Sequence, residues 1–252
     1  MRGLYLAEGA MLVQQAQLQV ISNNLANLRT TGFRRDHGVE TSFAEWMIYE
    51  LRPDLGTGKG GTLQPLGSTA HNVATQETVT SFFMGPLEVT NRQLDFALVG
   101  NGFFQVEGED GTLYTRNGRF VRNNEGILTT IEGYQVIGEG GPITLETDEV
   151  VAKPDGSLFA GGIQVGQLQI AVFSTEALME KSGFNYFKTD SAEDGEADFE
   201  VLNGFLEGSN VSMIREMTAL MTVRRTYEAA QKMMITYDQL LSKAANDLGS
   251  SA

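Results

Sequence analysis

The sequence predicts an α+β protein in which N- and C-terminal heptad helices pack as a coiled-coil base and enclose a central antiparallel β-rich domain. Apolar residues recur at alternating spacings of three and four near both ends, as they do in coiled coils. Short apolar runs in the middle alternate with residue pairs that favour tight turns. At 252 residues and 41% hydrophobic content, the chain is long enough to bury such a core.

The N-terminal region, residues 1–35, is predicted to be a coiled-coil helix that runs from about Leu4 to Leu28. No proline interrupts it, and residues 30–32, of sequence Thr-Thr-Gly, favour its end. All positions of its heptad seam except Gln14 are apolar. This N-terminal seam consists of Leu4, Ala7, Met11, Gln14, Leu18, Ile21, Leu25 and Leu28.

The C-terminal region, residues 211–252, repeats the pattern over a longer stretch. Ser209 or Asn210 can cap the start of the helix, and Gly249 favours its end. One such stripe is typical of an ordinary amphipathic helix, but two seams at opposite ends favour helices that pair with each other and with other copies. The C-terminal seam consists of Leu220, Val223, Tyr227, Ala230, Met234, Tyr237, Leu241, Ala244 and Leu248.

Residues 79–187 are predicted to form the antiparallel β domain, because β-branched and aromatic runs alternate with turn pairs at strand-length intervals. Residues 36–78 are expected to form an extended linker or an irregular subdomain, because residues 52–72 are rich in Gly, Thr and Pro. Residues 188–210 are predicted to form an acidic loop and a return segment. The turn pairs are Asp110-Gly111, Asn117-Gly118, Glu125-Gly126, Glu132-Gly133 and Asp155-Gly156.

The formal charge of −14 is concentrated in the middle of the chain. Residues 1–35 carry four basic and one acidic side chain and residues 211–252 five basic and four acidic, which leaves −18 for residues 36–210. Near-neutral ends suit close packing of many copies, and an acidic middle suits a hydrated surface. The charge argues against nucleic-acid binding, and the absence of a long apolar run argues against membrane insertion.

No catalytic, metal-binding or cofactor-binding residue is predicted. Residues 56–61 match the letters of a G-x-G-x-x-G fingerprint, but Pro65 and Gly67 follow where a helix would have to begin. His37 and His71 lack partners at metal-ligand spacing, and the acidic residues near Asp194 do not follow the ligand spacing of a calcium loop. The sequence contains no cysteine, which excludes disulfides and thiolate chemistry.

An enzyme reading would need paired carboxylates, since neither histidine nor cysteine chemistry is supported. Glu107, Asp110 and Asp95 are the candidates in the β region, and they would suit a carboxylate-dependent glycan hydrolase. Asp110 belongs to a turn pair and Glu107 flanks it, so both residues are better explained as turn charges. The hydrolase is therefore a remote alternative.

Motifs spread along the chain resemble those of the flagellar rod, hook and hook-associated proteins. They extend from the end of the first predicted helix to the start of the second, so the resemblance spans nearly the whole sequence. The motifs are Ser22–Asn27 with Thr31–Arg34, Gly100–Phe104, Tyr114–Phe120, Gly126–Leu128 with Gly133–Val136, and Leu206–Val211, together with Arg225, Tyr227, Glu228 and Gln231 in the second helix.

The resemblance implies a structural rod subunit that polymerises into a helical tube and transmits motor torque to the hook. It implies export by the flagellar secretion apparatus, across the cytoplasmic membrane to the periplasm or cell-wall zone of the basal body. No cleaved signal peptide is expected, because Gln and Asn interrupt the apolar character of the first thirty residues. The length favours a rod subunit over the hook protein, and the proximal rod type is weakly favoured over the distal type.

The expected partners are further copies of the chain and other rod or hook-junction subunits. The asparagines after the first helix can fix its register against a packed helix or cap its end. A secreted β-rich binding or adhesin module on a helical stalk is the main alternative. The predicted assembly interface consists of Leu4, Met11, Leu18, Ile21, Asn23, Asn24, Leu25, Asn27, Leu220, Val223, Tyr227, Met234, Tyr237 and Leu241.

Overall fold

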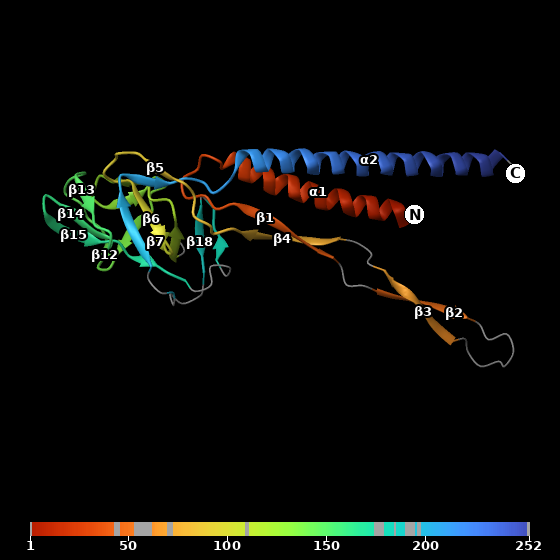
Figure 1. The fold of residues 1–252 in the computed structure, drawn as a ribbon, viewed down its shortest axis with the longest axis horizontal. Helices are drawn as coiled ribbons and strands as arrows, with labels where there is room; N and C mark the ends of the chain where they lie inside the picture. The colour runs from red at the N-terminus through yellow and green to blue at the C-terminus, as the bar shows by residue number, and fades with distance from the viewer. Residues whose placement is uncertain are drawn as a thin grey trace. The chain divides into compact units, whose positions relative to one another are not determined.

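The chain divides into two compact units in a computed structural model (Figure 1). One unit holds residues 1–23, 37–79 and 214–252, and the other holds residues 24–36 and 80–213. The second is called the β-rich unit below. The structure describes residues 2–42, 46–52, 62–69, 73–108, 111–173, 179–183, 185–189, 195 and 198–250.

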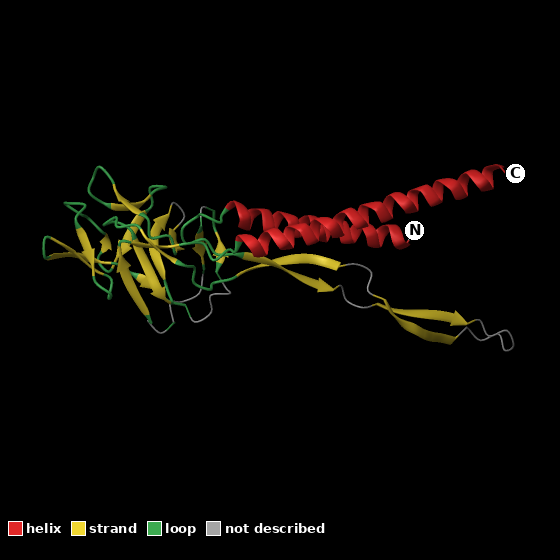
Figure 2. Ribbon diagram, turned by 45° about the horizontal axis from the view of Figure 1, so that its top comes forward, coloured by secondary structure: helices red, strands yellow, loops and turns green. Residues whose placement is uncertain are grey.

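Two long helices occupy the ends of the chain, as predicted (Figure 2). Helix α1 spans Arg2–Ala26 and helix α2 spans Met213–Ser250. Both are free of proline, and both carry a heptad pattern. Helix α2 begins three residues after Asn210, so neither Ser209 nor Asn210 directly precedes it. It ends one residue past Gly249.

Residues 36–80 contain four paired strands, whereas an extended linker or an irregular subdomain was expected for residues 36–78. Strand β1 pairs with β4, and β2 pairs with β3 antiparallel. Pro65 lies opposite Tyr49, next to a register shift, in a strand with one partner, where the missing N–H of proline is tolerated. The strands are β1 (Asp36–Ser42), β2 (Trp46–Arg52), β3 (Thr62–Thr69) and β4 (Val73–Thr80).

The β-rich unit contains the predicted antiparallel domain. Its largest sheet has the order β17-β18-β8-β7-β11-β10-β9, with β12 paired to β11 and β16 to β7. Smaller sheets pair β13-β14-β15, β6-β19 and β5-β20. The strands are β5 (Leu87–Val89), β6 (Phe96–Gly100), β7 (Phe103–Gly108), β8 (Gly111–Thr115), β9 (Phe120–Arg122), β10 (Leu128–Thr130), β11 (Gln135–Gly138), β12 (Gly141–Pro142), β13 (Val150–Ala152), β14 (Ser157–Ala160), β15 (Ile163–Gln167), β16 (Ile170–Ala171), β17 (Glu180–Lys181), β18 (Tyr186–Lys188), β19 (Phe199–Asn203) and β20 (Phe205–Glu207).

Three of the predicted turn pairs join antiparallel neighbours. Gly126, Gly133 and Gly156 adopt positive φ between β9 and β10, β10 and β11, and β13 and β14. Strands β7 and β8 also form a hairpin, although Asp110 itself lies outside the described residues. The Asn117-Gly118 pair was wrongly predicted as a hairpin turn, because β8 and β9 are not paired and lie at separate places in the sheet.

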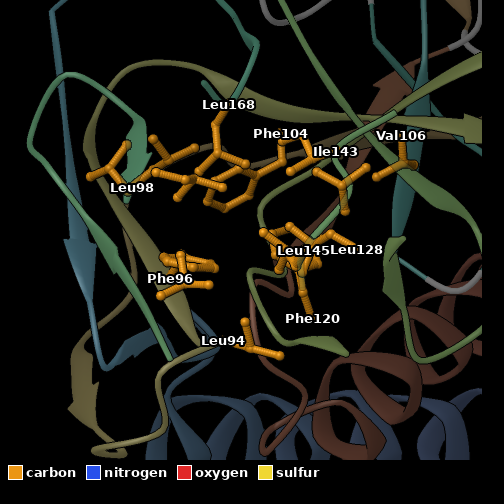
Figure 3. Packing of buried hydrophobic residues seen from close by; sticks show 14 of the residues in the cluster. Leu94, Phe96, Leu98, Phe104, Val106, Phe120, Leu128, Ile143, Leu145 and Leu168 are labelled. Carbon is orange, nitrogen blue, oxygen red and sulfur yellow. The ribbon is translucent and has the colours of Figure 1, made fainter. Parts of the chain in front are cut away.

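The core of the β-rich unit consists of two clusters of buried side chains, and Figure 3 shows the larger one. Phe104 and Val106 of β7 enter the larger cluster with Phe96 and Phe120, while Phe103 faces a smaller cluster with Phe187. This period of two is what a strand buried on both faces requires. The Phe104 and Phe120 rings meet edge to face, with centroids 5.3 Å apart.

Candidate functional site

The predicted seam residues of α1 lie within the less exposed side of that helix, which also includes Gly9 and Val13. Met11, Leu18 and Leu25 are half-buried and Ile21 is buried. The side chain of Leu4 lies outside the described residues. The spacing of these side chains follows the predicted heptad.

The seam residues of α2 differ in exposure between the first and the second half of the helix. Between Met221 and Met234 the only side chains that are not exposed are those of Val223, Tyr227, Ala230 and Met234, all seam positions, and Leu220 is half-buried as well. Tyr237 and Leu241, further along, are exposed. The second half of α2 therefore presents large apolar side chains to solvent.

The signature asparagines differ in exposure. Asn24 is buried and binds the backbone of Asp36 in both directions, donating from Nδ2 to the carbonyl oxygen at 2.7 Å and accepting from the amide N–H at 2.9 Å. Asn27 accepts a hydrogen bond from the Thr30 hydroxyl at 3.1 Å in the turn after α1. Asn23 is exposed. Asn24 thus fixes the return of the chain after α1, within one molecule.

The charged centre of the β-rich unit is an ion-pair triad of Arg34, Glu207 and Arg116, all three fully or almost fully buried. Both terminal nitrogens of Arg34 meet the Glu207 carboxylate, at 2.5 and 3.2 Å. Arg116 Nη1 lies 3.6 Å from Oε2, the carboxylate oxygen that Arg34 Nη2 also contacts. One buried carboxylate is therefore shared by two guanidinium groups. In this geometry the carboxylate needs both guanidinium groups as partners.

Backbone groups complete the surroundings of Glu207. The Gly85 N–H donates to Oε1 at 2.7 Å, and the Gly32 N–H donates to the Glu207 carbonyl oxygen, also at 2.7 Å. Arg116 donates to the carbonyl oxygens of Leu98 and Gly100. The triad therefore joins the segment that follows α1, the β domain and the segment that precedes α2.

Asn210 joins the same segments with one side-chain amide. Its Oδ1 accepts from the Arg35 N–H at 2.6 Å, and its Nδ2 donates to the carbonyl oxygens of Ser81 and Phe83 at 2.9 and 2.8 Å. Both N–H donors of the amide are used, and its oxygen accepts one hydrogen bond. This explains why an amide, rather than a carboxylate, occupies position 210.

Replacing Asn210 with Asp is expected to lower the free energy of unfolding by about 1–3 kcal/mol, because a carboxylate would face two carbonyl oxygens without a proton to donate. Urea unfolding of the full chain measures the change. Asn203→Asp is the matched control, since the Asn203 amide makes one bond, to the Gln93 carbonyl oxygen at an exposed position. An equal loss in both variants would contradict the role given to Asn210.

A lysine contacts the segment that follows α1. Lys181 Nζ lies 2.7 Å from both the Arg34 carbonyl oxygen and Asp36 Oδ1, and 4.4 Å from the centre of the Phe33 ring. Burial lowers the pKa of the Lys181 ammonium group, and the hydrogen bond and charge of Asp36 oppose that shift. Burial and the hydrogen bond to Glu132 raise the pKa of the Tyr186 hydroxyl on the neighbouring strand.

The two described carboxylates of the enzyme alternative, Glu107 and Asp95, do not form an accessible pair. Glu107 is exposed on β7, whereas Asp95 is completely buried and its carboxylate cannot reach a substrate. Among the described residues, no three His, Cys, Asp or Glu side chains lie close enough to share a metal ion. The histidine His37 is exposed on β1, while His71, the 56–61 glycines and residues 190–194 lie outside the described residues. No helix in the described part of the chain has the length and apolarity needed to cross a membrane.

Each member of the triad lies in a segment matched by a different family model. Residues 4–34, with Arg34, match the flagella basal body rod protein family. Residues 97–171, with Arg116, match the D1 domain of the flagellar hook protein FlgE/F/G, and residues 202–248, with Glu207, match the C-terminal region of the flagellar basal body rod FlgEFG proteins.

Curated relatives cover the chain from end to end. The flagellar basal-body rod protein FlgG of Agrobacterium fabrum is 34% identical over 98% of this chain and 100% of its own length. The chain belongs to the flagellar basal-body rod protein family. FlgF of Caulobacter vibrioides is 31% identical, over 98% of this chain and 97% of that protein, and FlgG of Borreliella burgdorferi is 33% identical over 98% of both.

Family membership confirms the resemblance seen in the motifs and lends no support to the adhesin or hydrolase alternatives. Relatives of both the FlgG and the FlgF name match at similar identity, so the weak preference for the proximal type stays a prediction. Arg34, Arg116 and Glu207 all lie in the motifs that carried the resemblance. Their meeting as one triad was not predicted, because residues 34 and 207 are 173 positions apart.

Proposed function

We propose that this member of the rod family is a structural subunit of the flagellar basal-body rod, polymerised through coiled-coil packing of α1 and α2. The observation that supports this proposal is the pattern of side-chain exposure along α2. The seam is the less exposed side of the helix up to Met234, whereas Tyr237 and Leu241 are exposed. Apolar side chains at such exposed positions contribute to stability only when another helix buries them. In the assembled tube, the seams of neighbouring copies provide that cover and carry torque to the hook.

Two features of the β-rich unit support a load-bearing role. The triad and Asn210 bind the segments next to both helices into one hydrogen-bonded centre, so a force applied at either segment is resisted by buried bonds. Other acidic residues of the middle of the chain, such as Glu88, Glu107 and Glu125, are exposed and keep the surface hydrated.

The proposal includes export by the flagellar apparatus without a cleaved signal peptide, and assembly with other rod or hook-junction subunits in the periplasm or cell-wall zone. The relatives that support it are named as basal-body rod proteins. No cofactor is required, since polymerisation needs only complementary surfaces.

Adjacent alanines in α2 provide the test. Ala230 is a buried seam position and Ala229 is exposed. The same substitution to Asp therefore places a carboxylate on the seam side of the helix in one variant and on the exposed side in the other. Ala230→Asp is expected to abolish incorporation into basal bodies, because a carboxylate in a packed seam loses its hydration without gaining a partner.

Basal bodies isolated from cells that carry each variant in place of the native copy give the measurement, with motility in soft agar as the readout of function. Ala229→Asp should assemble and support swimming as the wild type does. Normal assembly of Ala230→Asp would contradict the proposed packing of the seam. The absence of the wild-type chain from isolated basal bodies would contradict the rod function itself.

A further inference from the structure

The segment from Phe83 to Val89 displays apolar side chains in the single chain. Phe83 is 84% exposed, and Met84, Pro86 and Val89 are exposed as well. Val89 pairs across the strand with Phe205, which is only half-buried. Scattered exposed apolar residues are ordinary, but a row of them along one short segment marks an interaction surface.

The backbone of this segment is held rigidly from inside the β-rich unit. The Phe83 carbonyl oxygen accepts from Arg34 Nη1 at 3.1 Å and from Asn210 Nδ2 at 2.8 Å. The Gly85 N–H binds Glu207, and the Pro86 carbonyl oxygen accepts from the Gly208 N–H at 2.8 Å. An aromatic side chain on such a fixed backbone loses little conformational entropy on binding, which is what an interface anchor requires.

A complementary surface lies at the start of α2. Met213, Met217 and Met221 follow each other at intervals of four, which places them in one row along the helix, and they are between 41% and 62% exposed. Met217 and Met221 directly follow the protected positions Glu216 and Leu220, so these two side chains are rotated by about 100° from the protected side of the helix. Packing of the seam therefore leaves Met217 and Met221 uncovered.

We propose that Phe83 of one copy docks on the row Met213, Met217 and Met221 of a second copy of this chain. Methionine is adaptable and its sulfur packs favourably against aromatic rings, so the row suits an incoming phenylalanine. Both surfaces are uncovered in the single chain. The exposed Glu88 lies in the Phe83–Val89 segment, and the exposed Arg225 lies four residues after Met221 in line with the methionine row. These two residues add opposite charges to the contact.

A contact between two different surfaces of identical chains is heterologous and generates an open helical array when it does not close on itself. The contact rests on the proposed rod function and adds to the seams a second, lateral attachment that involves the β-rich unit. A second copy is the chosen occupant because one chain carries both halves of the contact and leaves both of them uncovered.

Phe83→Ser tests the anchor, with Ile163→Ser on β15 as the matched control, since Ile163 is 74% exposed and lies outside both surfaces. Phe83→Ser should reduce incorporation into basal bodies at least about tenfold, the effect typical of an interface anchor. The melting temperature of the purified chain should stay unchanged, because the removed side chain is 84% exposed. Ile163→Ser should incorporate normally. Wild-type incorporation of Phe83→Ser would overturn the proposal.

The absence of native cysteine permits a direct test in assembled rods. Two differently tagged copies, one with Phe83→Cys and one with Met217→Cys, are co-expressed, and isolated basal bodies are treated with a short bismaleimide. A product carrying both tags is expected, and the pair Ile163→Cys with Met217→Cys should give none. Assembled rods that yield no such product, or that join Phe83→Cys to a different protein, would overturn the contact while leaving the rod function in place. Wild-type chain missing from basal bodies would overturn both.

Discussion

Replacing Glu207 with Gln is expected to lower the free energy of unfolding of the β-rich unit by about 3–5 kcal/mol, the usual consequence of removing one partner from a buried ion pair. Arg34 and Arg116 would remain buried with their positive charges uncompensated. The new amide group would also direct N–H donors at guanidinium N–H groups. Few single substitutions outside a packed core should destabilise this chain as much.

Urea unfolding followed by near-ultraviolet circular dichroism measures the effect, because Tyr114, Tyr134 and Tyr186 report on the β-rich unit. Glu88→Gln is the control, since Glu88 is exposed on β5 opposite Leu206. Its effect should stay within about 0.5 kcal/mol, as for most surface substitutions. A Glu207→Gln variant as stable as the Glu88→Gln variant would show that the triad contributes little.

A double substitution separates the ion pair from the site as a whole. Arg34→Met together with Glu207→Leu removes the two opposite charges at once, so the combined loss should be smaller than the sum of the two single losses. Strict additivity would mean that Arg34 and Glu207 act independently, which their bidentate geometry contradicts.

The elements that local chemistry specifies were predictable from the sequence. Both helices follow from the heptad pattern, and the hairpins at Gly126, Gly133 and Gly156 follow from the need for positive φ in a tight turn. The strands of residues 36–80 were not predicted because residues 52–72 are rich in Gly, Thr and Pro, which are also typical of loops. Pairing between strands, which the composition does not show, decides the outcome.

The triad and the Asn210 bonds were beyond prediction from one sequence. Arg34, Arg116 and Glu207 lie in motifs that signalled the family, but a motif does not show which distant motif it meets. Burial of a charge depends on all the surrounding elements, so it emerges only when the β-rich unit is complete. Asn24 is similar, because its bonds to Asp36 depend on the path of the chain after α1.

Replacing Gly118 with Ala is expected to unfold the β-rich unit or to destabilise it by more than about 4 kcal/mol, a loss seen only for severe defects. A Cβ atom at position 118 would lie 1.8 Å from the Phe96 carbonyl oxygen, and the backbone N–H of Phe96 donates to the Gly118 carbonyl oxygen at 3.0 Å. The obstacle is backbone in a core strand, so rotation of a side chain cannot relieve it.

Gly140→Ala is the matched control because a Cβ there meets no atom within 4 Å and Gly140 does not adopt positive φ. That variant should be as stable as the wild type or slightly more stable, since alanine restricts the unfolded chain. Urea unfolding and soluble yield of the two variants, measured side by side, give the answer. A Gly118→Ala variant that folds with wild-type stability would mean that β6 and the 116–118 segment separate easily. The presence of glycine at position 118 would then be explained by the predicted turn and not by the close approach of Phe96.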